Sequence, residues 1–131
     1  MARIFITGSA GGLGQLAAKM LTGLGHQVIL HARNAERGRE ARRKVPEAQT
    51  VVTGDLSNIE EIKNLAREVN DLGTFDAVIH NAGVYQASAK DIFSVNTLAS
   101  YILTCLIRKP KRLIYPIVGK NINEWRLSQL N

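Results

Sequence analysis

A glycine-rich segment near the start of the chain has the residue types and spacing of a phosphate-binding turn. It reads Thr7-Gly8-Ser9-Ala10-Gly11-Gly12-Leu13-Gly14, follows the apolar run Ile4-Phe5-Ile6 and precedes a helical pattern that extends to Leu24. A helix that starts here points its first unpaired N–H groups and the positive end of its dipole at a ligand. Side chains at positions 8, 12 and 14 would block the tight turn, the close approach of the backbone to a phosphate, or the packing of the helix on the strand, so glycines are needed there. An ordinary strand-to-helix turn is the alternative, but the strand and helix around it favour a cofactor diphosphate.

Further polar segments follow the later apolar runs. Arg33 comes after the second run, Asp55-Leu56 after the third and Asn81-Ala82-Gly83 after the fourth, and Asn96 lies in the helical pattern that begins soon afterwards. The carboxyl ends of parallel strands meet at one edge of a sheet, where ligands bind. We therefore expect these residues near the glycine turn. Taken singly, Asp55, Asn81 and Asn96 would be interpreted as turn or cap residues.

The elements that must position these residues alternate between strand-like and helical patterns. This alternation predicts an α/β fold: a Rossmann-like, doubly wound parallel sheet of about five strands between two layers of helices, with right-handed crossovers. The expected strands are residues 3–7, 27–31, 49–53, 75–80 and 112–118. Local signals support the helices: Asn34 is a candidate N-cap, Ser57 to Glu60 has the form of a capping box, and Gly25 and Gly73 stand where helices should end.

These motifs together resemble the short-chain dehydrogenase/reductase family. The Thr-Gly-x-x-x-Gly-x-Gly turn, the Asp-Leu pair, Asn-Ala-Gly and Phe93-Ser94-Val95-Asn96 occur in the family's order, and the resemblance covers residues 1 to about 115. It implies a nicotinamide dinucleotide as cofactor and a truncated, cofactor-binding half of the family's domain. By this resemblance the diphosphate lies at Gly8, Gly12 and Gly14, the adenine amine at Asp55, and the cofactor ribose near Asn81 and Gly83. The rest of the implied cofactor-binding set is Thr7, Leu13, Leu56 and Ala82.

The end of the second strand bears on the choice between NADP and NAD. An acidic side chain here would accept hydrogen bonds from the 2′-OH of NAD and repel a phosphate. The chain instead has Ala32, which leaves room, and Arg33, whose guanidinium suits a 2′-phosphate, with Arg37 one helical turn further on. The glycine turn supplies no second basic residue. We expect NADP(H) to be preferred over NAD(H).

The family's main catalytic residues have no counterpart in this chain. The family uses Tyr-x-x-x-Lys and a serine after the fifth strand, whereas the corresponding stretch here reads Pro116-Ile117-Val118-Gly119 and no tyrosine has a lysine four residues on. Asn96, which the resemblance assigns to a water-linked proton relay, is therefore a supporting catalytic residue only.

Three functions stay open from the sequence. The first is an NADP-binding relic of a reductase that has lost efficient carbonyl reduction. The second is an active oxidoreductase, completed by another polypeptide or using a donor such as His80 or Tyr85. The third is a non-catalytic module that responds to NADP(H).

Composition sets further bounds. The 131 residues are 45% hydrophobic and 21% charged, which is typical of one globular domain. We expect a cofactor domain at residues 1–118 and a divergent tail at 119–131. The net charge of +6 arises largely from two basic clusters without aromatic residues between them, which favours solvated helix faces over nucleic-acid binding. We expect no metal site and no membrane segment, and a cytoplasmic location.

Three expectations concern exposed surfaces. Cys105 lies in an apolar helical pattern, which favours a small buried residue over a reactive thiol. The strand at 112–118 would be a sheet edge, with Pro116 blunting it. The helix at residues 92–107 is a candidate surface for self-association, because the family commonly packs subunits through it.

Overall fold

The computed structural model describes residues 1–83, 88, 90, 94–115 and 126–129. At its centre is a sheet with strand order β3-β2-β1-β4-β5-β6. The first five strands are parallel, and β6 runs antiparallel to β5. The strands are β1 (Arg3–Ile6), β2 (Gln27–Ala32), β3 (Thr50–Thr53), β4 (Ala77–Ile79), β5 (Arg112–Tyr115) and β6 (Arg126–Gln129).

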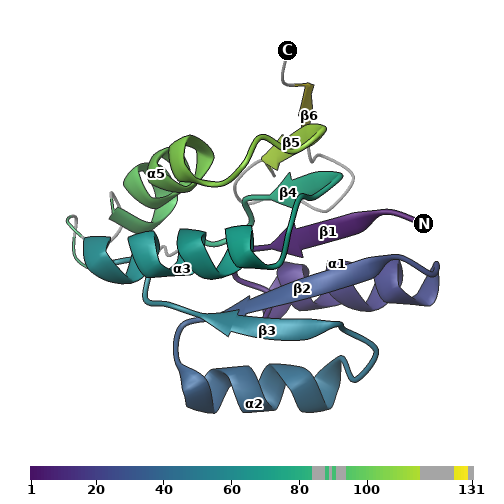
Figure 1. Ribbon diagram of the computed structural model, residues 1–131. Coiled ribbons are helices and arrows are strands. Elements are labelled where there is room, and N and C mark those ends of the chain that lie inside the picture. The colour runs from purple at the N-terminus through teal and green to yellow at the C-terminus, as the bar shows by residue number, and fades with distance from the viewer. Residues whose placement is uncertain (84–87, 89, 91–93, 116–125, 130–131) are drawn as a thin grey trace.

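Helices cover the sheet on both faces (Figure 1). Helices α1 (Gly12–Gly23) and α2 (Ala35–Lys44) lie on one face. Helices α3 (Ile59–Asp71) and α5 (Ala99–Leu106) lie on the other, and a π-helical turn, η1 (Ser94–Leu98), leads into α5. This arrangement confirms the predicted doubly wound, Rossmann-like α/β fold with its five parallel strands.

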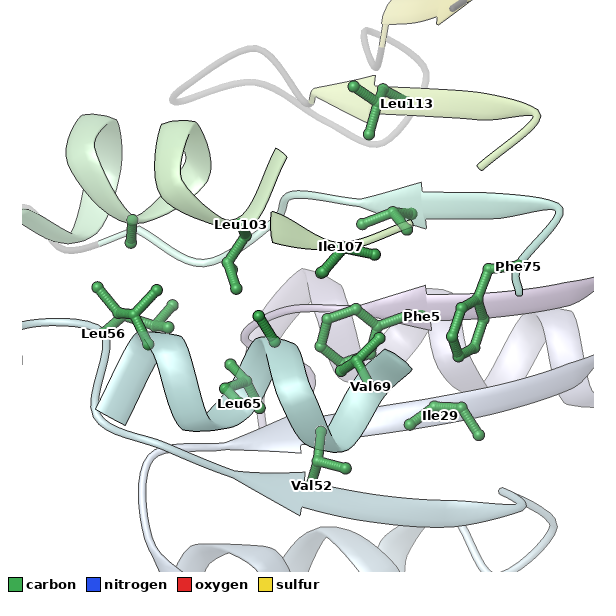
Figure 2. Close-up of a cluster of buried hydrophobic side chains, with 14 residues drawn as sticks. Phe5, Ile29, Val52, Leu56, Leu65, Val69, Phe75, Leu103, Ile107 and Leu113 are labelled. Atoms are coloured by element: carbon green, nitrogen blue, oxygen red, sulfur yellow. The ribbon is translucent and has the colours of Figure 1, made fainter. Parts of the chain in front are cut away.

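The alternation of side chains along the strands produces two cores. Phe5 of β1 packs into the core beneath α3 and α5, which Figure 2 shows, whereas its neighbours Ile4 and Ile6 pack toward α1 and α2. All three side chains are buried, and burial of a large apolar side chain contributes about 1.5–3 kcal/mol. Because β1 is central and apolar on both faces, its carboxyl end is held firmly where the glycine turn begins.

The helix ends confirm two sequence signals and correct a third. Asn34 caps α2 by accepting a hydrogen bond from the Arg37 N–H, and Gly25 and Gly73 follow α1 and α3 with φ of 89° and 109°. The prediction of a capping box that begins at Ser57 was wrong. The N-cap of α3 is Asn58, which accepts from the Glu61 N–H at 3.1 Å, because Ser57 donates from both its N–H and its hydroxyl to Oδ1 of Asp55.

Two surface expectations were also wrong. The strand β5 is not a sheet edge, because residues of the tail form β6 and pair with it from Arg112↔Gln129 to Tyr115↔Arg126. Cys105 is exposed rather than buried. It lies two residues from the buried Leu103, a rotation of about 200° around the helix that turns it away from the sheet.

Candidate functional site

The glycine turn after β1 is fastened to the end of β4. The Thr7 N–H donates to the Ile79 carbonyl (3.0 Å), and Thr7 Oγ1 accepts from the Ala82 N–H (3.1 Å). Nδ2 of Asn81 donates to the Gly8 carbonyl at 3.2 Å. Two motifs that are more than 70 residues apart in the sequence therefore form one surface at the carboxyl edge of the sheet.

Close packing explains why this surface needs residues without side chains. Gly8 has φ +66°, and a Cβ there would lie 2.8 Å from Cα of Ala82. A Cβ on Gly14 would lie 2.5 Å from both Nδ2 of Asn81 and the Gly8 carbonyl oxygen. Gly12 differs, because its φ is +58° and nothing lies within 4 Å of the Cβ position. Gly8 and Gly14 thus allow close contacts, whereas Gly12 leaves open space beside the start of α1.

The start of α1 has the features of an anion site. Its N-cap, Gly11, makes no side-chain capping bond, and its first turn carries no acidic residue. The first N–H groups of a helix have no carbonyl partner within it and carry the positive end of its dipole. A phosphate beside Gly12 and Leu13 would satisfy these donors.

His31 also holds the glycine turn, which the sequence analysis missed. Its Nδ1 accepts from the Gly8 N–H at 2.9 Å, and its Nε2 lies 2.8 Å from the Gly54 carbonyl oxygen. Its backbone N–H donates to Ser9 Oγ at 2.8 Å. Burial lowers the pKa of His31, although the Gly54 hydrogen bond and the Asp55 charge act in the opposite direction.

Arg33 and Asp55 form an ion pair beyond the ends of β2 and β3. Nε of Arg33 lies 3.2 Å from Oδ2 of Asp55, and the arginine side chain is 73% exposed. Partial burial by itself raises the pKa of Asp55, but the hydrogen bonds from Ser57 and the Arg33 guanidinium outweigh it and lower the pKa. Asp55 is therefore ionised at neutral pH and holds Arg33 at the edge of the site.

A cavity of about 740 Å³ joins these groups. Its volume is typical of small-molecule sites, about 300–1,000 Å³. Of the sequence-predicted residues it is lined by Gly8, Gly12, Leu13, Arg33, Asp55, Leu56, Asn81, Ala82 and Gly83. Thr7 and Gly14 lie behind the lining, where they hold the turn together. The lining also includes Ala10, Gly11, His31, Ala32, Asn34, Arg37, Gly54, Ser57 and Val95.

These lining residues fit a dinucleotide. Side-chain-free backbone at a helix start suits a diphosphate, and two guanidinium groups, from Arg33 and Arg37, face the same cavity. NH2 of Arg37 lies 3.8 Å from the Cβ position of Gly11. A cation is thus close to the turn as well as to the end of β2.

The region expected to support catalysis is only partly assembled. Asn96 is half-buried in η1, and the cavity reaches its neighbour Val95 but not Asn96 itself. Tyr85, one of the two candidate proton donors, lies outside the described residues.

His80 is buried between β4, β5 and α5. It stacks on Tyr115 with ring centroids 5.0 Å apart, and Thr104 Oγ1 lies 3.4 Å from its Nε2 and 3.1 Å from the Tyr115 hydroxyl. Its Nδ1 is buried and has no hydrogen-bond partner among the residues that the structure describes. Burial lowers the pKa of His80 to about 4, so the ring is neutral at pH 7 and cannot serve there as an imidazolium acid.

The part of the chain that the structure describes holds neither a metal-ligand cluster nor a membrane-spanning helix. No three His, Cys, Asp or Glu side chains in that part are grouped as a metal ion would require. No helix in that part has the length and apolar character to cross a membrane.

Comparisons with known proteins agree with this geometry. Residues 2–108 match the short chain dehydrogenase family. The chain is 56% identical over 126 residues to the uncharacterized oxidoreductase AN7799 of Emericella nidulans, covering 88% of this chain and 49% of that protein. It is 48% identical over 122 residues to the short-chain dehydrogenase chyC of Penicillium rubens, covering 88% of this chain and 47% of that protein. The chain thus spans about half the length of these curated relatives.

A solved structure shares the fold. A metagenomic short-chain oxidoreductase in complex with NADP superimposes with a TM-score of 0.73 at 27% identity, covering 91% of this chain and 64% of that one.

Proposed function

Because this chain belongs to the short-chain dehydrogenase family, whose members bind nicotinamide dinucleotides, we propose that it binds NADP(H) in the cavity at the carboxyl edge of its sheet. One observation carries the proposal: the glycine turn and the guanidinium groups of Arg33 and Arg37 line the same cavity of about 740 Å³. The diphosphate would lie against the first N–H groups of α1, and the 2′-phosphate against the two arginines.

The remaining contacts follow the order of the residues around the cavity. Asp55 would accept from the adenine amine while it holds Arg33, and Leu56 would supply an apolar wall beside it. Asn81, Ala82 and Gly83 would face the nicotinamide ribose, since they continue β4 beyond the glycine turn. A bound nicotinamide supplies hydride transfer to or from a carbon centre.

Arg33 and the absence of an acid at the end of β2 support NADP over NAD. The 2′-OH of NAD is usually bound by an Asp or Glu at this place, and Ala32 and Arg33 stand there instead. The family member solved in complex with NADP has the same fold, which supports this choice by analogy.

For this polypeptide by itself we propose binding without efficient carbonyl reduction. The stretch after β5 offers no serine, and the sequence has no Tyr-x-x-x-Lys. His80 does not replace them, because it is neutral at pH 7 and is not among the residues that line the cavity. Loss of an acid–base group typically lowers the rate about 10²- to 10⁴-fold. Two alternatives remain: an oxidoreductase that is active through another donor such as Tyr85 or is completed by another polypeptide, and a non-catalytic module that responds to NADP(H).

A fluorescence titration with NADPH tests the binding proposal. We expect saturable binding by the purified chain, and loss of binding in Gly12→Glu, whose carboxylate would enter the open space beside the start of α1. Gly23→Glu, at the other end of the same helix, is the matched control and should bind normally. Wild-type protein that never saturates would refute the proposal.

Reduction of aldehydes and ketones then separates the three functions. We expect negligible NADPH oxidation by the chain alone. Activity that appears only with cell extract would support completion by another polypeptide, whereas full activity of the pure chain would contradict the proposed loss of catalysis. Unchanged inactivity together with NADPH-dependent capture of a protein would support the responsive module.

We also propose self-association through the helix at 92–107. Tyr101 and Leu106 are 67% and 44% exposed in the described part of that helix. These side chains add exposed apolar surface to a helix through which the family commonly packs subunits. Tyr101→Glu with Leu106→Glu should therefore convert a dimer to a monomer in analytical ultracentrifugation. The control is Met20→Glu on α1, a helix that also exposes apolar side chains. If only this control variant is monomeric, the interface lies on α1 instead.

A further inference from the structure

His31 is bonded to two other strand ends at the cofactor site. It lies on β2, accepts from the Gly8 N–H beyond β1 and contacts the Gly54 carbonyl beyond β3. Gly8 opens the diphosphate turn, and Gly54 directly precedes Asp55. One buried side chain thus spans from the expected diphosphate end to the expected adenine end of the cavity.

The two bonds fix the protonation state of the ring. The Gly8 N–H is a donor, so Nδ1 must present a lone pair. The Gly54 carbonyl is an acceptor, so Nε2 must carry the hydrogen. Only the neutral Nε2–H tautomer satisfies both partners, which lie at 2.9 and 2.8 Å.

We propose that His31 is a positioning residue for the dinucleotide: its neutral ring sets the spacing between the glycine turn and the Asp55 segment, and a second proton on the ring weakens cofactor binding. This inference rests on the proposed function. The residue touches no reacting atom and acts through Gly8 and Gly54.

Proton uptake at Nδ1 would disrupt this spacing directly. It would place an N–H of the ring against the Gly8 N–H at a 2.9 Å separation, so that Gly8 must move away. The charged groups facing the ring or its cavity are Asp55 beyond β3, Arg33 beyond β2 and Arg37 on α2. Burial opposes the second proton, whereas the Gly54 carbonyl and the Asp55 charge favour it.

Three variants separate positioning from simple packing. His31→Leu removes both bonds at similar size. His31→Asn retains an amide oxygen near the place of Nδ1 and can accept from Gly8. His26→Leu is the matched control, because His26 also accepts a backbone N–H at Nδ1, from Ala2 at 2.9 Å, but is not among the cavity-lining residues.

The first measurement is the dissociation constant for NADPH and for NADH from pH 8 down to the lowest pH at which the protein stays folded. We expect both constants of the wild type to rise with acidity, approaching tenfold per pH unit below the pKa of His31. NADH is included because it lacks the 2′-phosphate of NADPH, a phosphate monoester that itself titrates at about pH 6. His31→Leu should weaken binding by about tenfold at pH 7.5 and lose its excess pH dependence, His31→Asn should recover most of the affinity, and His26→Leu should match the wild type.

The second measurement needs no cofactor. Nitrogen-15 NMR of the free protein should show Nδ1 of His31 unprotonated and Nε2 protonated at pH 7. The Gly8 amide shift should follow the titration of His31. If His31→Leu does not fold, these spectra and the affinities of His31→Asn still test whether His31 positions the glycine turn.

The outcomes are distinguishable. A wild type that binds neither dinucleotide refutes the proposed function, and the NMR result then decides whether His31 holds Gly8. If the wild type binds well, and both His31→Leu and His31→Asn bind as tightly as the wild type with the same pH dependence, the inference about His31 is overturned. The opposite tautomer in the NMR spectra would also overturn it.

Discussion

Glycines 8, 12 and 14 have the same side chain but different tasks in the turn. Gly8 combines a positive φ of 66° with a backbone contact to Ala82, whereas Gly12 has a positive φ of 58° and open space around it. Gly14 is limited by space, because Asn81 and the Gly8 carbonyl fill the place of a side chain. The spacing of the motif predicted all three positions, but their separate tasks depend on what the end of β4 brings beside them.

Alanine substitutions should reveal this difference as a graded loss of stability. Gly12→Ala should lower the free energy of unfolding by about 1–2 kcal/mol, because a side chain is strained at positive φ. Gly8→Ala should cost more, because its Cβ would also overlap Ala82. Gly23→Ala, with neither constraint, should be neutral or stabilise α1 by up to about 1 kcal/mol. Urea unfolding measures the series, and equal losses at Gly8 and Gly23 would contradict the assignment.

Arg33 is the residue on which the proposed preference for NADP depends. Arg33→Asp should weaken NADPH binding by about tenfold to a hundredfold, since a charge-assisted hydrogen bond contributes about 1.5–3 kcal/mol. The new carboxylate can accept from the 2′-OH of NADH, so NADH binding should be retained or improved. Arg39→Asp makes the same charge change outside the cavity lining and should leave both affinities nearly unchanged. Unchanged affinities in Arg33→Asp would remove the argument for NADP.

At the scale of elements, helix starts decide where the site residues point. Asn58 caps α3, and Ser57 is thereby left to hold the Asp55 carboxylate. The sequence motif contained both residues and could not tell them apart, because either can cap a helix. The choice follows from Asp55, whose oxygen accepts two hydrogen bonds from Ser57.

The two polar residues should therefore respond differently to replacement. Asn58→Ala should lower the free energy of unfolding by about 1 kcal/mol and speed hydrogen exchange at the Glu61 amide. Ser57→Ala should leave that amide slow but raise the pKa of Asp55, because it removes a hydrogen bond that favours the carboxylate. Rapid exchange at the Glu60 amide in Ser57→Ala, with the Glu61 amide unaffected in Asn58→Ala, would restore the capping box.

The end of β2 shows a signal that sequence reasoning could have used. His31 interrupts the apolar run Val28-Ile29-Leu30, in a strand expected to be buried on both faces. A buried polar group must find hydrogen-bond partners, so a histidine here already indicated a structural or functional bond. Its partners, Gly8 and Gly54, could not be identified without the register of β1, β2 and β3.

At the scale of the whole molecule, two buried histidines make stability depend on pH. Burial lowers the pKa of His80 from 6.5 to about 4 and also lowers that of His31. At a pH between the unfolded and the folded pKa of such a histidine, the unfolded chain binds more protons than the folded one, so acid favours unfolding. Stability from this source is complete above about pH 6.5 and is lost as the pH falls toward 4.

His80→Phe isolates the contribution of His80. Phenylalanine can keep the stacking on Tyr115, and it removes the buried Nδ1, for which the described part of the chain supplies no hydrogen-bond partner. The variant should be at least as stable as the wild type at pH 7. Between pH 6.5 and 4 it should lose up to about 1.4 kcal/mol less per pH unit, as measured by urea unfolding at each pH. Parallel stability curves for the two proteins would show that His80 does not titrate in this range.

The sequence by itself determined the parallel sheet, the position of the glycine turn and the family, because glycine spacing and apolar periodicity are local patterns. Tertiary structure alone decided that Asn81 and Ala82 close on Gly8, that Arg33 pairs with Asp55, that His31 joins three strand ends, and that β6 covers β5. These contacts join residues far apart along the chain, and their geometry depends on strand order and register, which no local pattern contains.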